Sequence, residues 1–160
     1  MTVAYMQAIT ERYQRLGYAP YRWYKAGDAP PWRPMAKPLA AARVGMLSTC
    51  GAYALGQVAY HYKDDTSMRK IPAVTPDKDL RFSHLTENYL VDPRRDPACI
   101  FPLRTLHSLA EEGFIGALAE DVFSCMGAVY SQRRVREELV PAVLASFKAQ
   151  NIDAALLVPM

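Results

Sequence analysis

The chain has 160 residues, a length that fits one domain and can bury a core without a disulfide or metal. Apolar residues make up 51% and charged residues 22%, which excludes wholesale disorder, collagen-like repeats and a coiled coil. The net charge of +3 is too small to indicate nucleic-acid binding by itself.

The few cysteines predict neither a disulfide framework nor a zinc site, because they are widely spaced and include no CxxC pair. His61 and His107 have no partners at metal-ligand spacing, so no metal site is expected. The N-terminus lacks the pattern of a secretory signal, and no stretch approaches the roughly 18 apolar residues of a membrane span. We therefore expect a reduced, cytoplasmic protein with no membrane contact.

Residues 1–39 are predicted to form a segment apart from the rest. Apolar side chains three and four residues apart predict an amphipathic helix over residues 3–16, which Gly17 ends. Residues 20–38 then hold five prolines among tyrosines and tryptophans. Because proline fixes φ and lacks an amide donor, we expect an extended arm, pinned by its aromatic side chains.

Residues 40–160 show the pattern of a separate α/β domain. Short apolar runs predict strands, and apolar side chains at helical spacing predict helices. The predicted strands are residues 44–49, 69–73, 80–84 and 153–160, and the predicted helices are residues 103–112 and 132–150. Pro141 must bend or break the second helix, and two Asp-Pro steps predict a loop over residues 92–97. This order predicts a mostly parallel sheet with flanking helices.

The chain stops on the last residues of a predicted apolar strand, and two interpretations stay open. Residues 153–160 are either a terminal edge strand, or the coding sequence continues and the sheet is incomplete at its C-terminus. Reactive side chains gather at the carboxyl ends of parallel strands. The second interpretation therefore puts the reactive group immediately after Met160.

Five stretches in one order carry a family resemblance. The longest is Asp96-Pro-Ala-Cys-Ile-Phe-Pro-Leu-Arg-Thr-Leu-His-Ser-Leu-Ala-Glu-Glu-Gly-Phe-Ile-Gly116. The others are Thr66-Ser-Met-Arg-Lys-Ile-Pro72, Asp79-Leu-Arg-Phe-Ser-His84, Phe123-Ser-Cys-Met-Gly127 and Asp153-Ala-Ala-Leu-Leu-Val-Pro159. Residues 40–160 thereby resemble the selenoprotein B family of glycine, sarcosine, betaine and D-proline reductases, whereas the proline-rich arm adds no match.

The resemblance implies a redox residue outside these 160 residues. In that family, the apolar strand before Pro159 runs into selenocysteine or cysteine followed by Pro-x-Cys-His. The codon for selenocysteine is normally read as a stop, so the resemblance implies an amino-terminal portion cut at its own active site. No catalytic residue is then expected in the chain as given.

The activity that the resemblance implies is that of an oxidoreductase. Such an enzyme cleaves a carbon–nitrogen bond of an amino acid or small amine, with a dithiol/disulfide couple as the redox partner. The implied partners are a reductase subunit that carries a pyruvoyl group and a small dithiol or thioredoxin-like donor. A homo-oligomer is compatible with this scheme, and nucleic acid has no role in it. The competing hypothesis is a non-catalytic α/β interaction module or scaffold subunit.

Four residues are candidates for substrate binding or support, each with an alternative. His84 either faces the active-site mouth and bonds substrate or selenolate, or is a structural histidine bonded to a backbone carbonyl. Arg69 either binds a substrate carboxylate or forms a surface ion pair with a nearby aspartate. Asp96 is expected to order a turn rather than act in acid–base chemistry. Cys50 either presents a thiol from a loop or fills the core.

Three remaining predictions concern side chains outside this set. Cys99 and Cys125 are expected to fill the core, and His107 is expected to be exposed. The Tyr, Trp and Arg residues of the arm favour partner binding over base stacking, because these residue types dominate protein interfaces.

Overall fold

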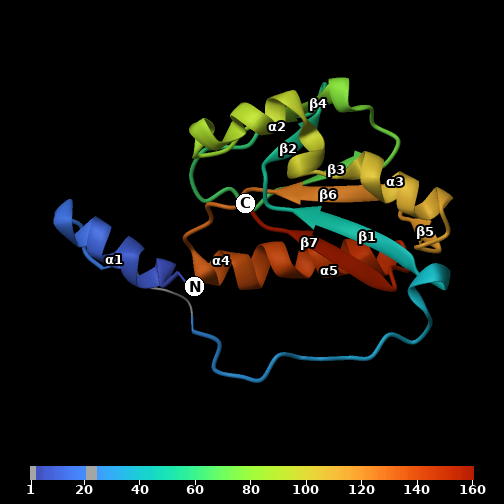
Figure 1. Cartoon of the computed structure of the whole chain (residues 1–160), viewed down its shortest axis with the longest axis horizontal. Helices are drawn as coiled ribbons and strands as arrows, with labels where there is room; N and C mark the ends of the chain where they lie inside the picture. Colours follow the sequence, from blue (N-terminus) through green and yellow to red (C-terminus); the bar gives the residue numbers. More distant parts are fainter. Residues whose placement is uncertain (1–2, 21–24) are drawn as a thin grey trace. The chain divides into compact units, whose positions relative to one another are not determined.

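The computed structural model describes residues 3–20 and 25–160 and divides the chain into two compact units, Met1–Pro34 and Met35–Met160 (Figure 1). In the first unit, helix α1 (Tyr5–Arg15) confirms the predicted amphipathic helix, and Gly17 follows it with φ of +82°. The described part of the arm, residues 25–38, contains no helix or strand, as predicted. Three of the aromatic side chains expected to pin the arm, Tyr21, Trp23 and Tyr24, lie outside the described residues.

A mostly parallel sheet forms the centre of the second unit. Its strands are β1 (Arg43–Ser48), β3 (Met68–Pro72), β5 (Ala117–Leu118), β6 (Asp121–Cys125) and β7 (Ala154–Val158). β1 pairs in parallel with β7 on one side and with β5 and β6 on the other, while β3 runs antiparallel to β6. The α/β architecture and the parallel C-terminal strand are therefore confirmed.

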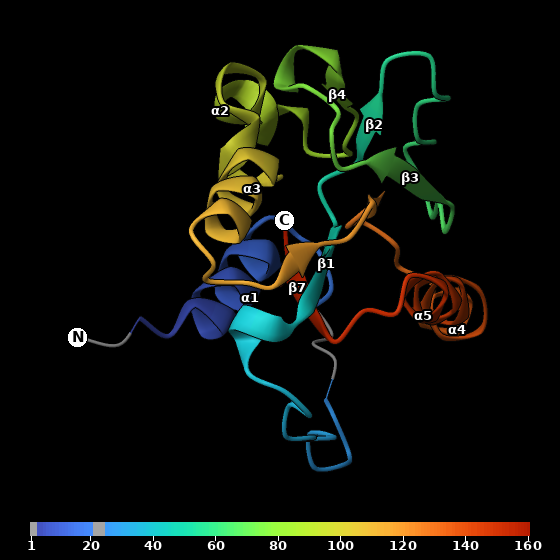
Figure 2. The same cartoon turned by 90° about the vertical axis from the view of Figure 1, so that its right-hand side faces the viewer.

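Helices cover both faces of this sheet (Figure 2). On one face, Leu103 and Leu106 of α3 (Leu103–Glu111) pack with Met46 and Val122 of the sheet in the main core. Each large apolar side chain that is fully buried contributes roughly 1.5–3 kcal/mol. On the other face, the ring of Phe147 in α5 (Val140–Ala149) lies 5.7 Å from that of Phe123 in β6, measured between centroids.

A small second sheet brings His84 to the end of β1. It pairs β2 (Ala52–Ala54) with β4 (Leu80–Phe82), so the predicted strand over residues 80–84 is shorter than expected and lies outside the main sheet. Gly51 starts this arrangement with φ of +66°, and a Cβ there would lie 2.0 Å from the carbonyl oxygen of Ser83. Only glycine permits this approach, which holds the segment before His84 against the end of β1.

The predicted loop over residues 92–97 is wrong in its first half, because α2 (Val91–Arg95) is a short helix. Pro93 fits within it because the first N–H groups of a helix have no partner inside the helix, so none is lost. The second half is correct, since Asp96 is extended with φ of −137° and ψ of 95°. Short 3₁₀ turns complete the chain at Leu39–Ala41, Asp77–Asp79, Glu87–Leu90 and Pro97–Cys99.

The predicted helix over residues 132–150 is interrupted, as Pro141 requires. It consists of α4 (Gln132–Arg134), a π-helical turn (Val135–Leu139) and α5. Pro141 is the second residue of α5, directly after the wider turn. No helix among the described residues has the length and apolar character needed to cross a membrane.

Candidate functional site

The carboxyl ends of three parallel strands meet at one edge of the main sheet. Ser48, Cys125 and Val158 end β1, β6 and β7, and the C-terminus lies beside the arrowheads of β1 and β6 (Figure 1). We call this the carboxyl edge. Ligands of open parallel sheets bind at such an edge, so it is the first place to look for chemistry.

Thr49 joins the ends of β1 and β7. Its backbone N–H donates to the carbonyl oxygen of Val158 at 3.0 Å, and its Oγ1 accepts the N–H of Met160 at 2.8 Å. These two bonds continue the register in which residues 44–48 pair with residues 154–158. Met160 is therefore fixed at the carboxyl edge by hydrogen bonds on the β1 side.

His84 supplies an unpartnered donor or acceptor to this edge. Its side chain is only 8% exposed, and Nδ1 lies 2.7 Å from Oγ1 of Thr86 and accepts the N–H of Thr86 at 3.2 Å. Nε2 is buried and has no hydrogen-bond partner in the part of the chain that the structure describes. A buried polar group without a partner costs about 1–3 kcal/mol, so it calls for an explanation.

Burial lowers the pKa of His84 below its ordinary value of 6.5, and the carboxylate of Glu87 opposes this effect in part. The imidazole is therefore neutral at pH 7. The structural alternative for His84 is wrong in its partner, because Nδ1 bonds to Thr86 instead of a backbone carbonyl. Nε2 stays unpartnered at the edge, so a bond to substrate or selenolate stays a prediction.

Gly127, two residues beyond β6, keeps this part of the edge open. A Cβ built on Gly127 would lie 2.8 Å from the carbonyl oxygen of Met160, 2.9 Å from that of Thr49 and 3.1 Å from Nε2 of His84. Three polar atoms from distant parts of the sequence thus surround the missing side chain. We call this point the Gly127 gap.

Cys50 does not present a thiol from a loop, so that alternative is wrong. Its side chain is fully buried, with Sγ 3.8 Å from Oγ of Ser124. Burial raises the pKa of the Cys50 thiol, and burial together with the neighbouring Cys50 raises that of Cys125 to about 12. Both thiols are protonated at neutral pH and therefore unreactive.

Two further predictions need correction. Cys99 is exposed rather than packed in the core, because it ends a 3₁₀ turn at the surface. His107 is half-buried rather than exposed, and its Nε2 lies 2.8 Å from the carbonyl oxygen of Ala73. Cys125 is buried as predicted.

Arg69 is occupied by neighbouring groups of the chain. Its guanidinium donates to the carbonyl oxygens of Val58 at 2.7 Å and Ala59 at 3.3 Å, and to Oγ of Ser67 at 2.8 Å. It also lies 4.3 Å from the centroid of the Tyr60 ring. These contacts fix the start of β3. The predicted ion pair of Arg69 with an aspartate is wrong, because its partners among the described residues are backbone carbonyls, a hydroxyl and a ring.

Asp96 orders a turn, as expected from its position before Pro97. Its Oδ1 accepts the N–H of Ala98 at 3.2 Å and a guanidinium N–H of Arg104 at 2.6 Å. The carboxylate thereby caps the 3₁₀ turn that follows it. Both contacts are with residues close in sequence, so Asp96 stabilises the turn in which it lies.

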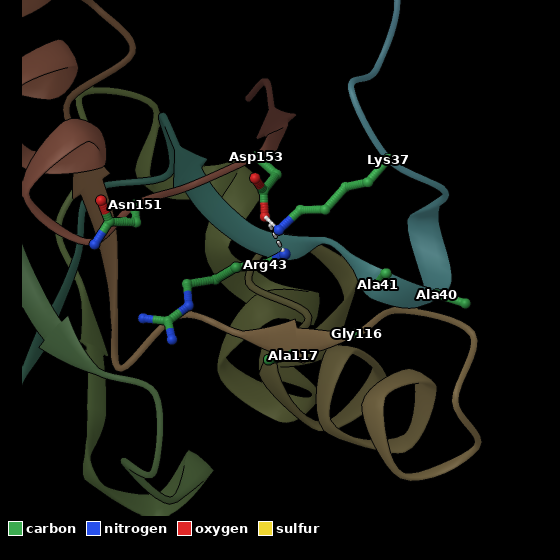
Figure 3. A pocket seen from close by; sticks show the side chains of 8 residues that line it. All are labelled: Lys37, Ala40, Ala41, Arg43, Gly116, Ala117, Asn151 and Asp153. Carbon is green, nitrogen blue, oxygen red and sulfur yellow. Dashed lines mark hydrogen bonds and ion pairs between the residues drawn. The ribbon is translucent and has the colours of Figure 1, made fainter.

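The opposite edge of the sheet holds a pocket of about 380 Å³ (Figure 3). Nζ of Lys37 lies 2.7 Å from Oδ2 of Asp153, which also accepts the N–H of Arg43 at 2.7 Å. The Arg43 guanidinium donates to the carbonyl oxygen of Gln150 at 3.3 Å. The charges in this pocket are thus paired with one another or with backbone, and it lies away from the carboxyl edge.

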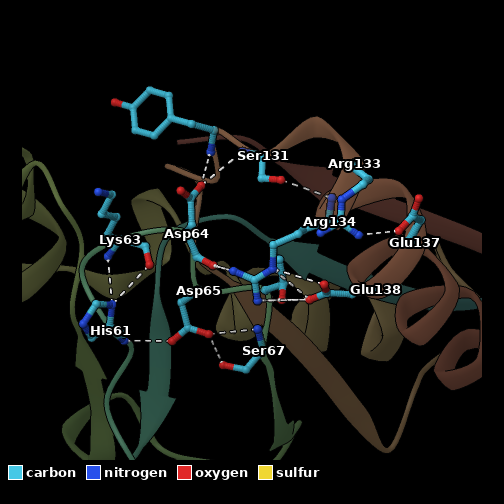
Figure 4. A network of polar contacts seen from close by, with 12 residues as sticks. His61, Lys63, Asp64, Asp65, Ser67, Ser131, Arg133, Arg134, Glu137 and Glu138 are labelled. Carbon is cyan, nitrogen blue, oxygen red and sulfur yellow. Dashed lines mark hydrogen bonds and ion pairs between the residues drawn. The ribbon is translucent and has the colours of Figure 1, made fainter.

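A polar network ties the loop before β3 to the start of α4 (Figure 4). Oδ1 of Asp64 accepts the N–H groups of Tyr130 at 2.6 Å and Ser131 at 3.1 Å. Arg134 donates to the carbonyl oxygen of Asp64 at 2.6 Å and pairs with Glu138 at 3.0 Å. The segment that follows Gly127 is therefore anchored within a few residues of the gap.

Among residues 3–20 and 25–160, no three His, Cys, Asp or Glu side chains gather in a way that could hold a metal ion. The polar groups of the carboxyl edge instead suit hydrogen bonding to a side chain or a small molecule.

Comparison with known proteins finds a relative among the reductases. Over 128 residues, the chain is 31% identical to subunit gamma of D-proline reductase from Acetoanaerobium sticklandii. The alignment covers 80% of this chain and 52% of the relative. The chain is a homologue of a subunit in the glycine, sarcosine, betaine and D-proline reductase family. No protein-family model and no solved structure matches it.

This reductase relationship confirms the resemblance inferred from the ordered sequence stretches. The chain spans about half the length of the curated relative that it matches. That relative is named as one subunit of its enzyme, so it works with partner subunits.

Sequence reasoning missed three residues that shape the edge of this reductase homologue. Thr49 is the last residue of a predicted strand and directly follows β1, Gly127 closes one of the stretches that carry the resemblance, and Thr86 lies two residues after His84. A hydroxyl or glycine immediately after a buried strand is the signal that points to such positions, because strand ends carry the sites of parallel sheets.

Proposed function

We propose that this chain is the amino-terminal portion of a reductase subunit that cleaves a carbon–nitrogen bond of an amino acid or small amine. The substrate class is that of the family, namely glycine, sarcosine, betaine or D-proline. The observation that carries the proposal is the parallel register of β7 with β1, which ends at the carboxyl edge beside an unpartnered His84. Homology to a D-proline reductase subunit supplies the reaction class.

The proposed redox residue is a selenocysteine or cysteine that follows Met160, as the family resemblance implies. The Thr49 contacts support this position, because the residue after Met160 would emerge at the edge where Thr49 holds the Met160 backbone. The buried thiols of Cys50 and Cys125 are poor alternatives, since burial raises the pKa of both.

The residues at the edge fit such a group. A selenolate or thiolate supplies a nucleophile and a two-electron redox centre, and a donor such as an imidazole N–H stabilises its charge. Thr49 would hold the peptide before the redox residue, and Gly127 would leave room for the redox side chain. His84 would face that side chain from a position buried away from water. None of these three residues needs to gain or lose a proton in this role.

The overall reaction balances with a dithiol as the reductant. The carbon–nitrogen bond breaks, the carbon gains one hydrogen and the nitrogen becomes an amine that carries another. The two electrons and two protons come from the dithiol, which is oxidised to a disulfide. In the proposed scheme, a partner subunit with a pyruvoyl group holds the substrate amine, and a small dithiol or thioredoxin-like protein is the donor.

The test is dithiol oxidation by the gene product that includes the residue after Met160, assayed with its partner subunit. We expect oxidation of dithiothreitol that depends on one of D-proline, glycine, sarcosine or betaine, and its loss when alanine replaces the redox residue. If none of the four amines supports oxidation although the partner binds, the chain is a scaffold and the proposed reaction is wrong.

A further inference from the structure

The backbone N–H of Thr86 determines the tautomer of His84. An N–H group can only donate, so its contact with Nδ1 at 3.2 Å favours an Nδ1 without a proton, to which the Thr86 hydroxyl at 2.7 Å can then donate as well. The neutral ring must then carry its proton on Nε2. The buried, unpartnered atom at the Gly127 gap is therefore an N–H donor.

The atoms around the gap need no such donor from one another. The other two polar atoms that a Cβ of Gly127 would touch are the carbonyl oxygens of Thr49 and Met160, and neither forms a hydrogen bond with Nε2. His84 is also more than nine-tenths buried, which leaves bulk water a poor partner. The N–H group is thus positioned for an acceptor that the described residues do not supply.

The backbone of Met160 indicates where an acceptor would arrive. Its carbonyl oxygen borders the gap, and consecutive Cα atoms in a chain lie about 3.8 Å apart. A residue joined to Met160 would therefore start at the border of the gap that Nε2 of His84 also faces.

We infer that His84, held as the Nε2–H tautomer by Thr86, donates a hydrogen bond to the chalcogen of the redox residue and thereby positions and stabilises its anionic form. This inference rests on the proposed function, which supplies the redox residue. It makes His84 a positioning residue whose effect is greatest on the ionised nucleophile, because a charged acceptor strengthens the bond.

The test compares two amide variants of His84 in the gene product that carries cysteine at the redox position. Glutamine can offer an amide N–H near the place of Nε2, whereas asparagine reaches only as far as Nδ1. The readout is the pH dependence of alkylation of the redox thiol by iodoacetamide, followed by mass spectrometry. Exposed Cys99 serves as the internal reference, and thermal unfolding verifies that each variant folds.

We expect His84→Asn to slow alkylation of the redox thiol about tenfold at pH 7, equivalent to a pKa raised by one unit. His84→Gln should stay within about twofold of the parent, and Cys99 should react equally in all three proteins. In the parent chain, ¹⁵N NMR of the imidazole should show the proton on Nε2. Equal alkylation of the parent and His84→Asn, or a proton on Nδ1, would overturn the inference.

The outcomes separate this inference from the proposed function. If the parent and His84→Asn are alkylated equally while amine-dependent dithiol oxidation is intact, the role of His84 is refuted and the proposed reaction still holds. If the parent does not oxidise dithiol but is alkylated faster than His84→Asn, the proposed reaction is refuted and the hydrogen bond from His84 still holds.

Discussion

Oγ1 of Thr49 accepts the backbone N–H of Met160 at 2.8 Å, across 111 positions of sequence. The same residue donates its own N–H to Val158 at 3.0 Å, so a single threonine ties the end of β1 to the end of β7 on two sides. The carboxyl edge thus depends on a side-chain bond as well as on the ladder of the sheet.

Replacing Thr49 by valine should loosen this connection. Valine keeps the shape of the side chain and removes the acceptor, which costs about 0.5–1.5 kcal/mol of unfolding free energy. Urea denaturation checks the loss, and amide hydrogen exchange at Met160 should become faster. Thr49→Ser is the matched control, since it keeps the hydroxyl; equal exchange in parent and Thr49→Val would contradict the bond.

A methyl group at Gly127 should destabilise the edge. Its Cβ would approach two carbonyl oxygens and an imidazole nitrogen at 2.8–3.1 Å, and overpacking of this kind costs about 1–3 kcal/mol. Gly27→Ala is the control, because nothing lies within 4 Å of a Cβ there. The midpoint temperature of thermal unfolding should be lower for Gly127→Ala than for the parent, and unchanged for Gly27→Ala. Equal melting of both variants would show that the gap tolerates a side chain.

The cysteines should differ sharply in reactivity. Burial raises the pKa of Cys50 and Cys125, so iodoacetamide at pH 7.5 should modify Cys99 in the folded protein and the other two only in denaturant. Peptide mass spectrometry checks the pattern. Cys50→Ser should leave dithiol oxidation unchanged, and rapid labelling of native Cys50 would restore it as a candidate nucleophile.

Asp65 should make the loop before β3 sensitive to acid. Burial raises its pKa, but hydrogen bonds from Ser67 and from the N–H of His61 outweigh this and hold the pKa below its ordinary value of 3.8. A carboxyl with a lower pKa in the folded state stabilises it fully above about pH 4, and that contribution is lost as the pH falls through the folded value. Limited proteolysis of the loop should therefore increase at acidic pH.

Asp65→Asn is the comparison for this acid effect. The amide cannot ionise, so cleavage of the loop in this variant should change less between pH 5 and pH 3 than in the parent. A parent loop that is equally protected at both pH values would mean that Asp65 adds nothing to stability there.

The sequence allowed correct prediction of the strands with clear apolar runs, β1 and β7, and of the helix that Pro102 opens. β6 was not predicted, although it lies between β1 and β3, because Glu120 and Asp121 interrupt its apolar pattern. The misassigned helix α2 has a similar cause, since Pro93 lies in a first turn where its missing N–H does no harm.

The candidate site was predictable only in part, because it is built from long-range contacts. His84 could be singled out from a family motif, but its unpartnered Nε2 depends on Thr86, Gly127 and the backbone of Met160 meeting at one edge. The two alternatives for Cys50 could not be separated from the sequence for the same reason. Its position after a strand indicates a loop, whereas packing against Ser124 buries it.

The most direct test of a reductase site at the carboxyl edge is mass spectrometry of the native gene product, combined with the dithiol assay. We expect a peptide in which selenocysteine or cysteine directly follows Val158-Pro159-Met160, from a protein that oxidises dithiol in the presence of one of the four amines. A native protein that carries out this amine-dependent oxidation with no selenium or thiol group after Met160 would contradict it.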